Sequence, residues 1–317
     1  MIARGFFIYL GIALCAAGEL RAVQRVEQQS FAVRPGCLVK IDTYRGLINI
    51  VPGTGNEVKI VVRSNLPAEK PESASAVLDG FELKASNQNN VVQITARNPR
   101  DSGVRFTWSK DLRPEIEFTV EVPAHCDLDL LTKDGGITVG NLRGNLKART
   151  ENGTIFFRQI EGDVDAFTPN GDVIVSRCTG SVMLRAVQGD IRVGTVGGRA
   201  RLETVNGDIE VLSSYAAIQA TTSVGDVKAG FAQLDEQSKI QTAVGNITAK
   251  INPAMGFSIN ATSSWGKVTS EFASDAQPGS RVHSRLTGRY NGGGPLIELK
   301  ASGGHIAIAP GEPLFQL

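Results

Sequence analysis

"ETVNGDIEV", residues 203–211, places an Asn-Gly pair between two short stretches of alternating apolar residues. That arrangement predicts a tight turn joining two β-strands. The phrase returns as "RTENGTIFF" from Arg149, "FTPNGDVIV" from Phe167, "RAVQGDIRV" from Arg185 and "TTSVGDVKA" from Thr221. The chain therefore repeats one strand–turn–strand unit along much of its length.

The turn glycines are evenly spaced through the middle of the chain. Each follows the previous one by 18 residues at Gly135, Gly153, Gly171, Gly189, Gly207 and Gly225. The spacing then widens to 20 and 21 residues, at Gly245 and Gly266, and outlying copies lie at Gly46 and Gly304. A fixed period of this length predicts stacked supersecondary units.

Equivalent positions around each glycine form columns. Positions seven and five before the glycine, and two and four after it, are apolar in successive copies, whereas the residues between them are mostly polar or charged. This alternation predicts two strands per copy, each with one buried face. A threonine three residues before the glycine shares that face, so we expect its methyl group to pack inward and its hydroxyl to bond the turn backbone. An ice-binding threonine array needs a doubled, outward column, and this column is single and inward by phase.

Two architectures fit these columns: successive antiparallel hairpins, or a parallel β-solenoid in which each copy is one coil. The constant period favours the solenoid, because stacked coils need equal perimeters. We therefore expect an all-β protein with a parallel β-solenoid of about 18-residue coils over residues 124–310. Residues 30–123 are predicted to hold the first solenoid copy and an antiparallel β section that caps the first coils.

The N-terminus resembles an export signal. Residues 1–22 contain one early cation, Arg4, an apolar run from Phe6 to Ala17, and small residues near Ala17, Gly18 and Ala22 where cleavage fits. No later apolar run is long enough to cross a bilayer, and a net charge of +1 gives no field that attracts nucleic acid. The sequence predicts an exported protein of the periplasm, cell surface or medium, with no integral membrane segment after cleavage.

The repeated phrase around Thr204–Val211 and the ending "NGGGPLIELKASGGHIAI", residues 291–308, together resemble the bacterial putative adhesin domains of unknown function. The resemblance covers roughly residues 35 to 310. It implies a parallel β-solenoid at the cell envelope and supplies no catalytic residues.

The sequence contains few residues in patterns typical of catalytic or metal-binding sites. The three histidines, His125, His283 and His305, have no second His or Cys at metal-ligand spacing, and no nucleophile elbow or phosphate-binding glycine loop is present. We predict no catalytic residue, cofactor or metal. The favoured function is a structural or binding module whose partner is an envelope protein or a glycan. The alternative is a carbohydrate-active enzyme, which would need carboxylates converging in a pocket, best sought after Gly225.

Three sets of residues are candidates for special roles. An exposed apolar patch is expected if neighbouring coils bring together Phe156, Phe167 and Ile174. Four aspartates follow the turn glycine in consecutive coils and form a predicted outward ladder of carboxylates: Asp172, Asp190, Asp208 and Asp226. They could bind calcium, be partly neutralised by Arg192 and Lys228, or stay solvated, and we predict a structural turn position without bound metal. Cys37 and Cys126 each lie nine residues before a turn glycine, so a disulfide is one option, although adjacent parallel strands suit it poorly. Cys178 occupies an inward column and is predicted to be a buried free thiol.

Overall fold

The computed structural model describes residues 8–14, 22–67, 81–97, 115–272 and 282–311. The described residues form β-strands joined by short turns, without an α-helix. The chain divides into two compact units, Met1–Gly153 and Thr154–Leu317. The predicted all-β class and the parallel solenoid are confirmed in both units.

The first unit contains two sheets. One has the order β1 (Ile8–Leu14), β2 (Ala22–Ala32), β5 (Glu57–Pro67), β8 (Glu115–Pro123), β4 (Leu47–Gly53) and β10 (Ile137–Val139). The other has the order β6 (Glu82–Gln88), β7 (Val91–Arg97), β3 (Cys37–Arg45), β9 (Cys126–Asp134) and β12 (Leu146–Asn152). A two-residue strand, β11 (Leu142–Arg143), follows β10.

The first unit joins an antiparallel section to parallel coils, as the sequence predicted. Strands β2, β5 and β8 pair antiparallel, as do β6 and β7, whereas β7 and β8 pair parallel with β3 and β4. The antiparallel strands therefore cover the edge of the first coil, which would otherwise expose unpaired backbone groups. Of the predicted leader, residues 1–7 and 15–21 lie outside the described residues, and residues 8–14 form β1, which pairs with β2.

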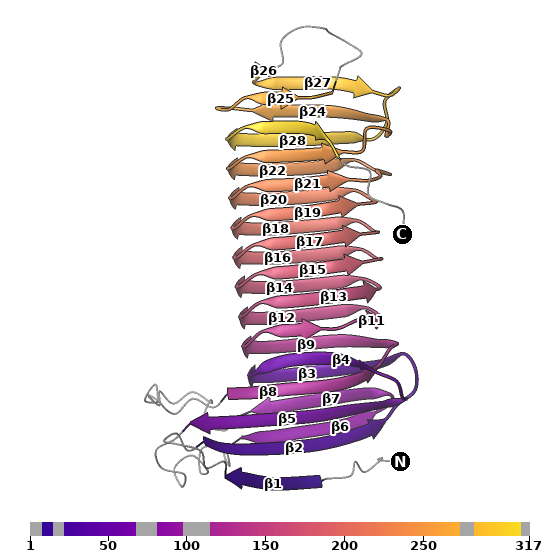
Figure 1. Cartoon of the computed structure of the whole chain (residues 1–317), viewed down its shortest axis with the longest axis vertical. Coiled ribbons are helices and arrows are strands. Elements are labelled where there is room, and N and C mark those ends of the chain that lie inside the picture. Colours follow the sequence, from indigo (N-terminus) through magenta and orange to yellow (C-terminus); the bar gives the residue numbers. More distant parts are fainter. Residues whose placement is uncertain (1–7, 15–21, 68–80, 98–114, 273–281, 312–317) are drawn as a thin grey trace. The chain divides into compact units, whose positions relative to one another are not determined.

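The second unit is a stack of coils, each contributing one strand to each of two sheets (Figure 1). The first sheet has the order β13 (Ile155–Glu161), β15 (Val173–Cys178), β17 (Ile191–Val196), β19 (Ile209–Ser214), β21 (Val227–Phe231), β23 (Ile247–Ile251), β29 (Ile306–Pro310), β25 (Val268–Ser270) and β26 (Val282–His283). The second has the order β14 (Val164–Asn170), β16 (Val182–Gln188), β18 (Ala200–Asn206), β20 (Ile218–Val224), β22 (Ser238–Val244), β28 (Leu296–Gly303), β24 (Phe257–Ser263) and β27 (Arg285–Tyr290).

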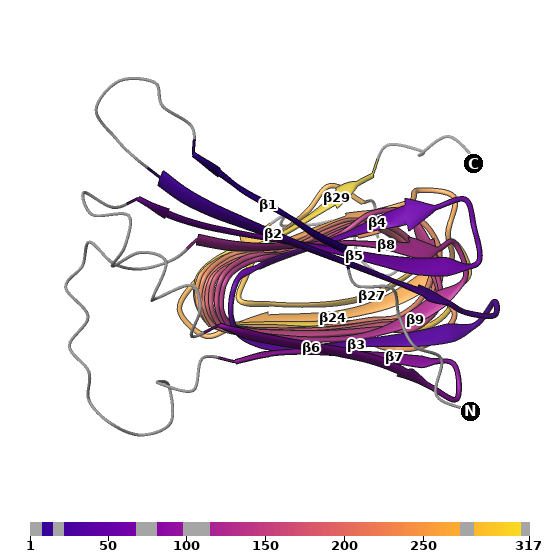
Figure 2. The ribbon, with the colours of Figure 1, turned by 90° about the horizontal axis from the view of Figure 1, so that it is seen from below.

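Neighbouring coils of the second unit pair in parallel with an offset of one repeat. Ile191 lies opposite Ile209, and Leu184 opposite Leu202, so each predicted column becomes a continuous line of like residues. Seen along the stack in Figure 2, each coil is a flattened loop with a sheet on either side. The inward residues fill its interior. Ile191 and Leu202 have no exposed surface, and burying each aliphatic side chain contributes about 1.5–3 kcal/mol.

The last coil does not stack in chain order. Strand β28 pairs with β22 on one side and with β24 on the other, and β29 likewise lies between β23 and β25. The coil of β24 and β25 thus comes earlier in the sequence, but the later coil of β28 and β29 lies next to β22 and β23. Strand β27 pairs antiparallel with β24 and ends the second sheet.

Candidate functional site: the turn edges of the stacked coils

The four aspartates after the turn glycines form a hydrogen-bonded ladder in the second unit. The Oδ1 atom of Asp172 accepts a bond from the backbone N–H of Asp190, at 2.9 Å. Asp190 accepts in the same way from Asp208, at 2.9 Å, and Asp208 from Asp226, at 2.7 Å. Each side chain therefore satisfies a backbone donor of the next coil, which would otherwise lack a partner at the turn.

This ladder extends beyond the residues that the sequence singled out. Asp226 accepts from the Asn246 N–H at 2.7 Å, and Asn246 Oδ1 accepts from the His305 N–H at 2.9 Å. His305 Nδ1 then accepts from the Lys267 N–H at 3.0 Å. Asn246 and His305 also follow a turn glycine directly, and this shared position was the signal that could have identified them.

Arg192 links two members of the ladder. Its guanidinium lies 3.3 Å from Asp172 Oδ2 and 2.5 Å from Asp190 Oδ2. The partial neutralisation expected from Arg192 is therefore present, although partly exposed ion pairs contribute little to stability. In the described part of the chain, no group of three or more His, Cys, Asp or Glu side chains is arranged to hold a metal ion.

The opposite turn of the coil has an acceptor of its own, which sequence reasoning missed. Asp163 Oδ1 accepts from the Ser181 N–H at 2.7 Å, and Asp235 Oδ1 accepts from the Ala217 N–H at 3.1 Å. In the first unit, Asp127 Oδ1 makes the same bond to the Asn145 N–H at 2.7 Å. Asp163 directly follows the second glycine of its repeat, Gly162, and that position carried the signal.

The threonine column faces inward and bonds the turn, as predicted. Thr204 Oγ1 donates to the Gly189 carbonyl at 3.0 Å, and Thr222 Oγ1 donates to the Gly207 carbonyl at 3.0 Å. Both threonines are buried. Glycine is needed at these turns for two reasons, as Gly189 shows. A Cβ there would lie 2.0 Å from the Gly171 carbonyl oxygen, and its φ of 152° is one that other residues rarely adopt.

The structure separates the three residues of the predicted apolar patch. Phe156 of β13 lies directly opposite Ile174 of β15, and both are half-buried on the outer face of one sheet. Phe167 lies in β14 of the other sheet, where its ring packs against the Arg185 guanidinium at 5.5 Å. Only Phe156 and Ile174 can therefore contribute to one surface.

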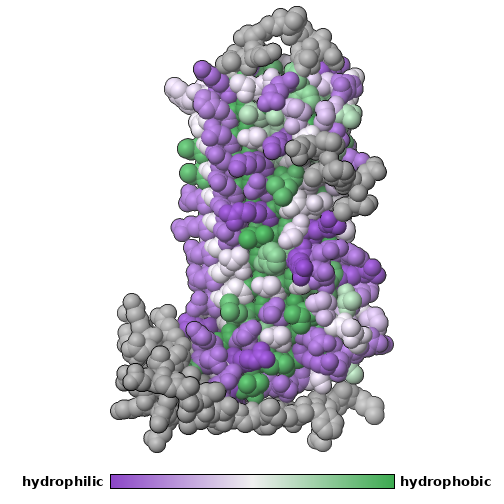
Figure 3. All heavy atoms as spheres, in the orientation of Figure 1, coloured by the Kyte–Doolittle hydropathy of each residue, from purple (hydrophilic) through white to green (hydrophobic). Residues whose placement is uncertain are grey.

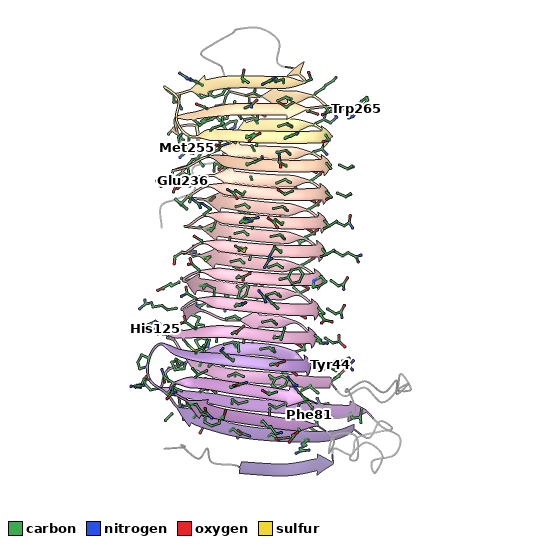
Figure 4. All side chains as sticks on the ribbon, turned by 180° about the vertical axis from the view of Figure 1, so that it is seen from behind. Tyr44, Phe81, His125, Glu236, Met255 and Trp265 are labelled. Carbon is green, nitrogen blue, oxygen red and sulfur yellow. The ribbon has the colours of Figure 1, made fainter. Side chains whose placement is uncertain are left out.

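A more exposed apolar row lies along the turn edge of the second unit, and we call it the apolar turn edge. Its members stand one or two residues before a turn glycine: Val187, Val205, Val224, Val244 and Trp265. In sequence order, exposure rises from 37% at Val187 to 58% at Val244 and 89% at Trp265. Val224 lies directly opposite Val244, whereas the coil of β28 and β29 separates Val244 from Trp265. Figure 4 shows Trp265 pointing away from the ribbon, at the edge opposite Met255 and Glu236. On the face turned to the viewer, Figure 3 shows hydrophobic positions among hydrophilic ones.

A cavity of about 310 Å³ lies on the other edge of the second unit, after Gly225, where an enzyme site was expected if one existed. Its lining includes Tyr215, Leu234, Asp235 and Met255, with Asp235 as its one carboxylate. Because its lining has a single carboxylate, this cavity does not present the pair of converging carboxylates that glycoside hydrolysis uses. Asp235 Oδ1 also accepts the Ala217 N–H.

The family model of the Toastrack DUF4097 domain matches residues 115–309, more than half of the 317-residue chain. The chain belongs to the Toastrack DUF4097 family. This match covers the repeats and the glycine-rich ending, and it confirms the resemblance to bacterial putative adhesin domains that the sequence showed. No curated protein matches this Toastrack chain.

Several solved structures are similar to the Toastrack chain at low identity. A putative adhesin from Bacteroides fragilis NCTC 9343 has 14% identity and a TM-score of 0.42, covering 90% of this chain and 97% of its own. A putative lipid binding protein from Parabacteroides distasonis ATCC 8503 has 14% identity and a TM-score of 0.44, covering 89% and 96%. A putative cell adhesion protein from Clostridium sporogenes ATCC 15579 has 13% identity and a TM-score of 0.22, covering 90% and 100%. Likeness this low says nothing about what this chain binds.

Among the described residues, none belongs to a helix with the length and apolar character needed to cross a membrane.

Proposed function

We propose that this Toastrack protein is exported and acts without catalysis, as a structural and binding module of the cell envelope. The proposal rests on the hydrogen bonds that the turn carboxylates make. Aspartates at both turns of the coils accept backbone N–H groups of the neighbouring coil, as Asp190 and Asp163 do. Side chains held in this way maintain a stack and are not aimed at a substrate.

The apolar turn edge supplies the surface for binding. Exposed apolar residues gathered along one edge mark interaction sites, and a large aromatic side chain at 89% exposure, such as Trp265, carries most of the binding energy when a partner covers it. The partner is an envelope protein or a glycan. The coils beneath the row are fixed by the aspartate and threonine bonds, so it is presented on a rigid support, which lowers the entropy lost on binding.

A binding screen tests whether the protein binds a partner through the apolar turn edge. The chain is expressed with its own leader, purified after export, and applied to arrays of glycans and envelope proteins. We expect a ligand whose affinity falls roughly tenfold or more in Trp265→Ala. The matched control is Leu212→Ala, because Leu212 is 64% exposed on the outer face of β19, away from the turn edge. Equal loss in both variants, or none in either, would contradict the assignment of the surface.

Export and the absence of catalysis have tests of their own. N-terminal sequencing of the exported protein is expected to begin after Ala17, Gly18 or Ala22, and an intact N-terminus in the cytoplasm would contradict export. The protein is also incubated with polysaccharides while new reducing ends and unsaturated products are measured. Turnover that is lost in Asp235→Asn would establish the carbohydrate-active enzyme instead.

A further inference from the structure

Two cysteines from distant parts of the sequence meet inside the first unit. Cys37 begins β3 and Cys126 begins β9, and the two residues lie directly opposite each other in parallel strands. Their sulfur atoms are 3.1 Å apart, and neither residue has exposed surface. The contact lies between the coil that precedes the antiparallel section and the coil that follows it.

The geometry is within reach of a covalent bond. Adjacent strands place opposite Cα atoms about 4.8 Å apart, inside the range of about 4.4–6.8 Å that disulfides span. A disulfide has its sulfurs about 2.05 Å apart, so each Sγ would have to move by about half an ångström from its present place. Rotation about the Cα–Cβ bonds can supply that movement, which answers the concern that adjacent parallel strands suit a disulfide poorly.

The two thiols also affect each other's ionisation. The hydrogen bond with Cys126 lowers the pKa of Cys37, whereas the same hydrogen bond, followed by burial, raises the pKa of Cys126. In the docked strands, Cys37 is therefore the more acidic thiol of the pair.

We propose that Cys37 and Cys126 form a structural disulfide that ties the first coil to the second across the antiparallel section. The oxidant is a protein or small-molecule disulfide of an oxidising compartment, so this proposal rests on the proposed export. Before the strands dock, the thiolate of one cysteine attacks the oxidant and forms a mixed disulfide, releasing one thiol. The other cysteine, deprotonated, then attacks the protein sulfur of the mixed disulfide and releases the second thiol. Overall, two protein thiols become one disulfide while the oxidant disulfide gains two electrons and two protons.

Burial sets the time at which the bond forms. Because neither cysteine has exposed surface, an oxidant cannot reach them once β9 has paired with β3. Oxidation therefore precedes the final docking of these strands, and the finished bond resists reductants that act on the folded protein. The closed loop contains β4 to β8, so the link restricts the unfolded chain over that whole section.

Refolding tests the bond separately from export. The fourth cysteine of the chain, Cys15, lies in the predicted leader and is first replaced by serine. This Cys15→Ser protein is unfolded in guanidinium with reductant, then refolded in a glutathione redox buffer, quenched with a maleimide and digested without reduction. We expect a bridged Cys37–Cys126 peptide that has lost two hydrogens, with Cys178 unlabelled until the protein is denatured. The bridged form should melt several degrees above the same protein refolded with reductant, and Cys37→Ala/Cys126→Ala should show no such difference.

Each result has a distinct meaning. Maleimide on both Cys37 and Cys126 after denaturation of the refolded protein would overturn the proposal, as would a bridge that includes Cys178. If the double variant fails to fold, the melting comparison between oxidised and reduced protein decides alone. A bridge that forms in vitro but is missing from protein recovered from cells would leave the disulfide standing and contradict export.

Discussion

Removing one whole coil should leave a folded, shorter protein. Deletion of residues 190–207 joins Gly189 to Asp208 and takes out strands β17 and β18. Ile209 then lies where Ile191 had been, opposite Val173, so the inward columns stay continuous. The aspartate ladder closes again as well, because the Asp208 N–H meets the Asp172 carboxylate in place of Asp190.

The size of the loss follows from the removed coil. Its inward residues Ile191, Val193 and Leu202 are at most 1% exposed, but every neighbouring residue regains an equivalent contact in the shortened stack. The net cost is then one coil's share of the total stability. At roughly 0.05–0.15 kcal/mol per residue this is about 1–3 kcal/mol.

Deletion of half a coil, residues 190–198, is the matched control. It would shift every later strand into the opposite sheet, so Thr204 would lose the Gly189 carbonyl and the ladder would break in all later coils. The cost should exceed the whole stability of a typical domain, about 5–15 kcal/mol. Circular dichroism and urea unfolding compare the two proteins. Equal damage from both deletions would refute the stacked coil as the unit of the fold.

Gly189→Ala should cost at least about 3 kcal/mol in urea unfolding, because its Cβ would lie 2.0 Å from the Gly171 carbonyl oxygen at a φ of 152°, whereas Gly55→Ala, with its nearest atom 4.0 Å away, should cost much less. Thr204→Val keeps the shape but removes the donor to the Gly189 carbonyl, and a loss of about 1–2 kcal/mol is expected; a neutral result would show that the bond is dispensable. Millimolar calcium, compared with chelator, should leave the melting temperature unchanged; the opposite outcome is a rise of many degrees that vanishes when all four ladder residues are changed to Asn: Asp172, Asp190, Asp208 and Asp226. Burial raises the pKa of Cys178 from 9.0 to about 11. Because the unfolded thiol ionises first, the free energy of unfolding should fall as pH rises from 9.0 to about 11. Cys178→Val should weaken that dependence, and identical pH profiles for the two proteins would contradict this assignment.

The sequence by itself determined the coil. The 18-residue period, the alternating columns and the turn glycines are local features, and side-chain alternation has the same meaning in any strand, so Ile191 and Leu202 could be placed inside without a structure. The inward threonines, the buried Cys178 and the equivalence of Cys37 with Cys126 followed from the same columns. The four aspartates could be aligned, but the bond each makes to the next coil depends on a neighbour 18 or 20 residues away.

Only the tertiary structure decided which strands became neighbours. The sequence places the Gly266 copy before the Gly304 copy, yet the stack has β28 and β29 next to β22 and β23, with β24 and β25 beyond them. Likewise, β7 and β8 pair in parallel with the first coil, while Phe167 lies in a different sheet from Phe156 and Ile174. Parallel strands joined by long connections can pair in several orders with the same local pattern. The order is selected by how well whole coils fit and bond one another, a property that no single stretch of sequence contains.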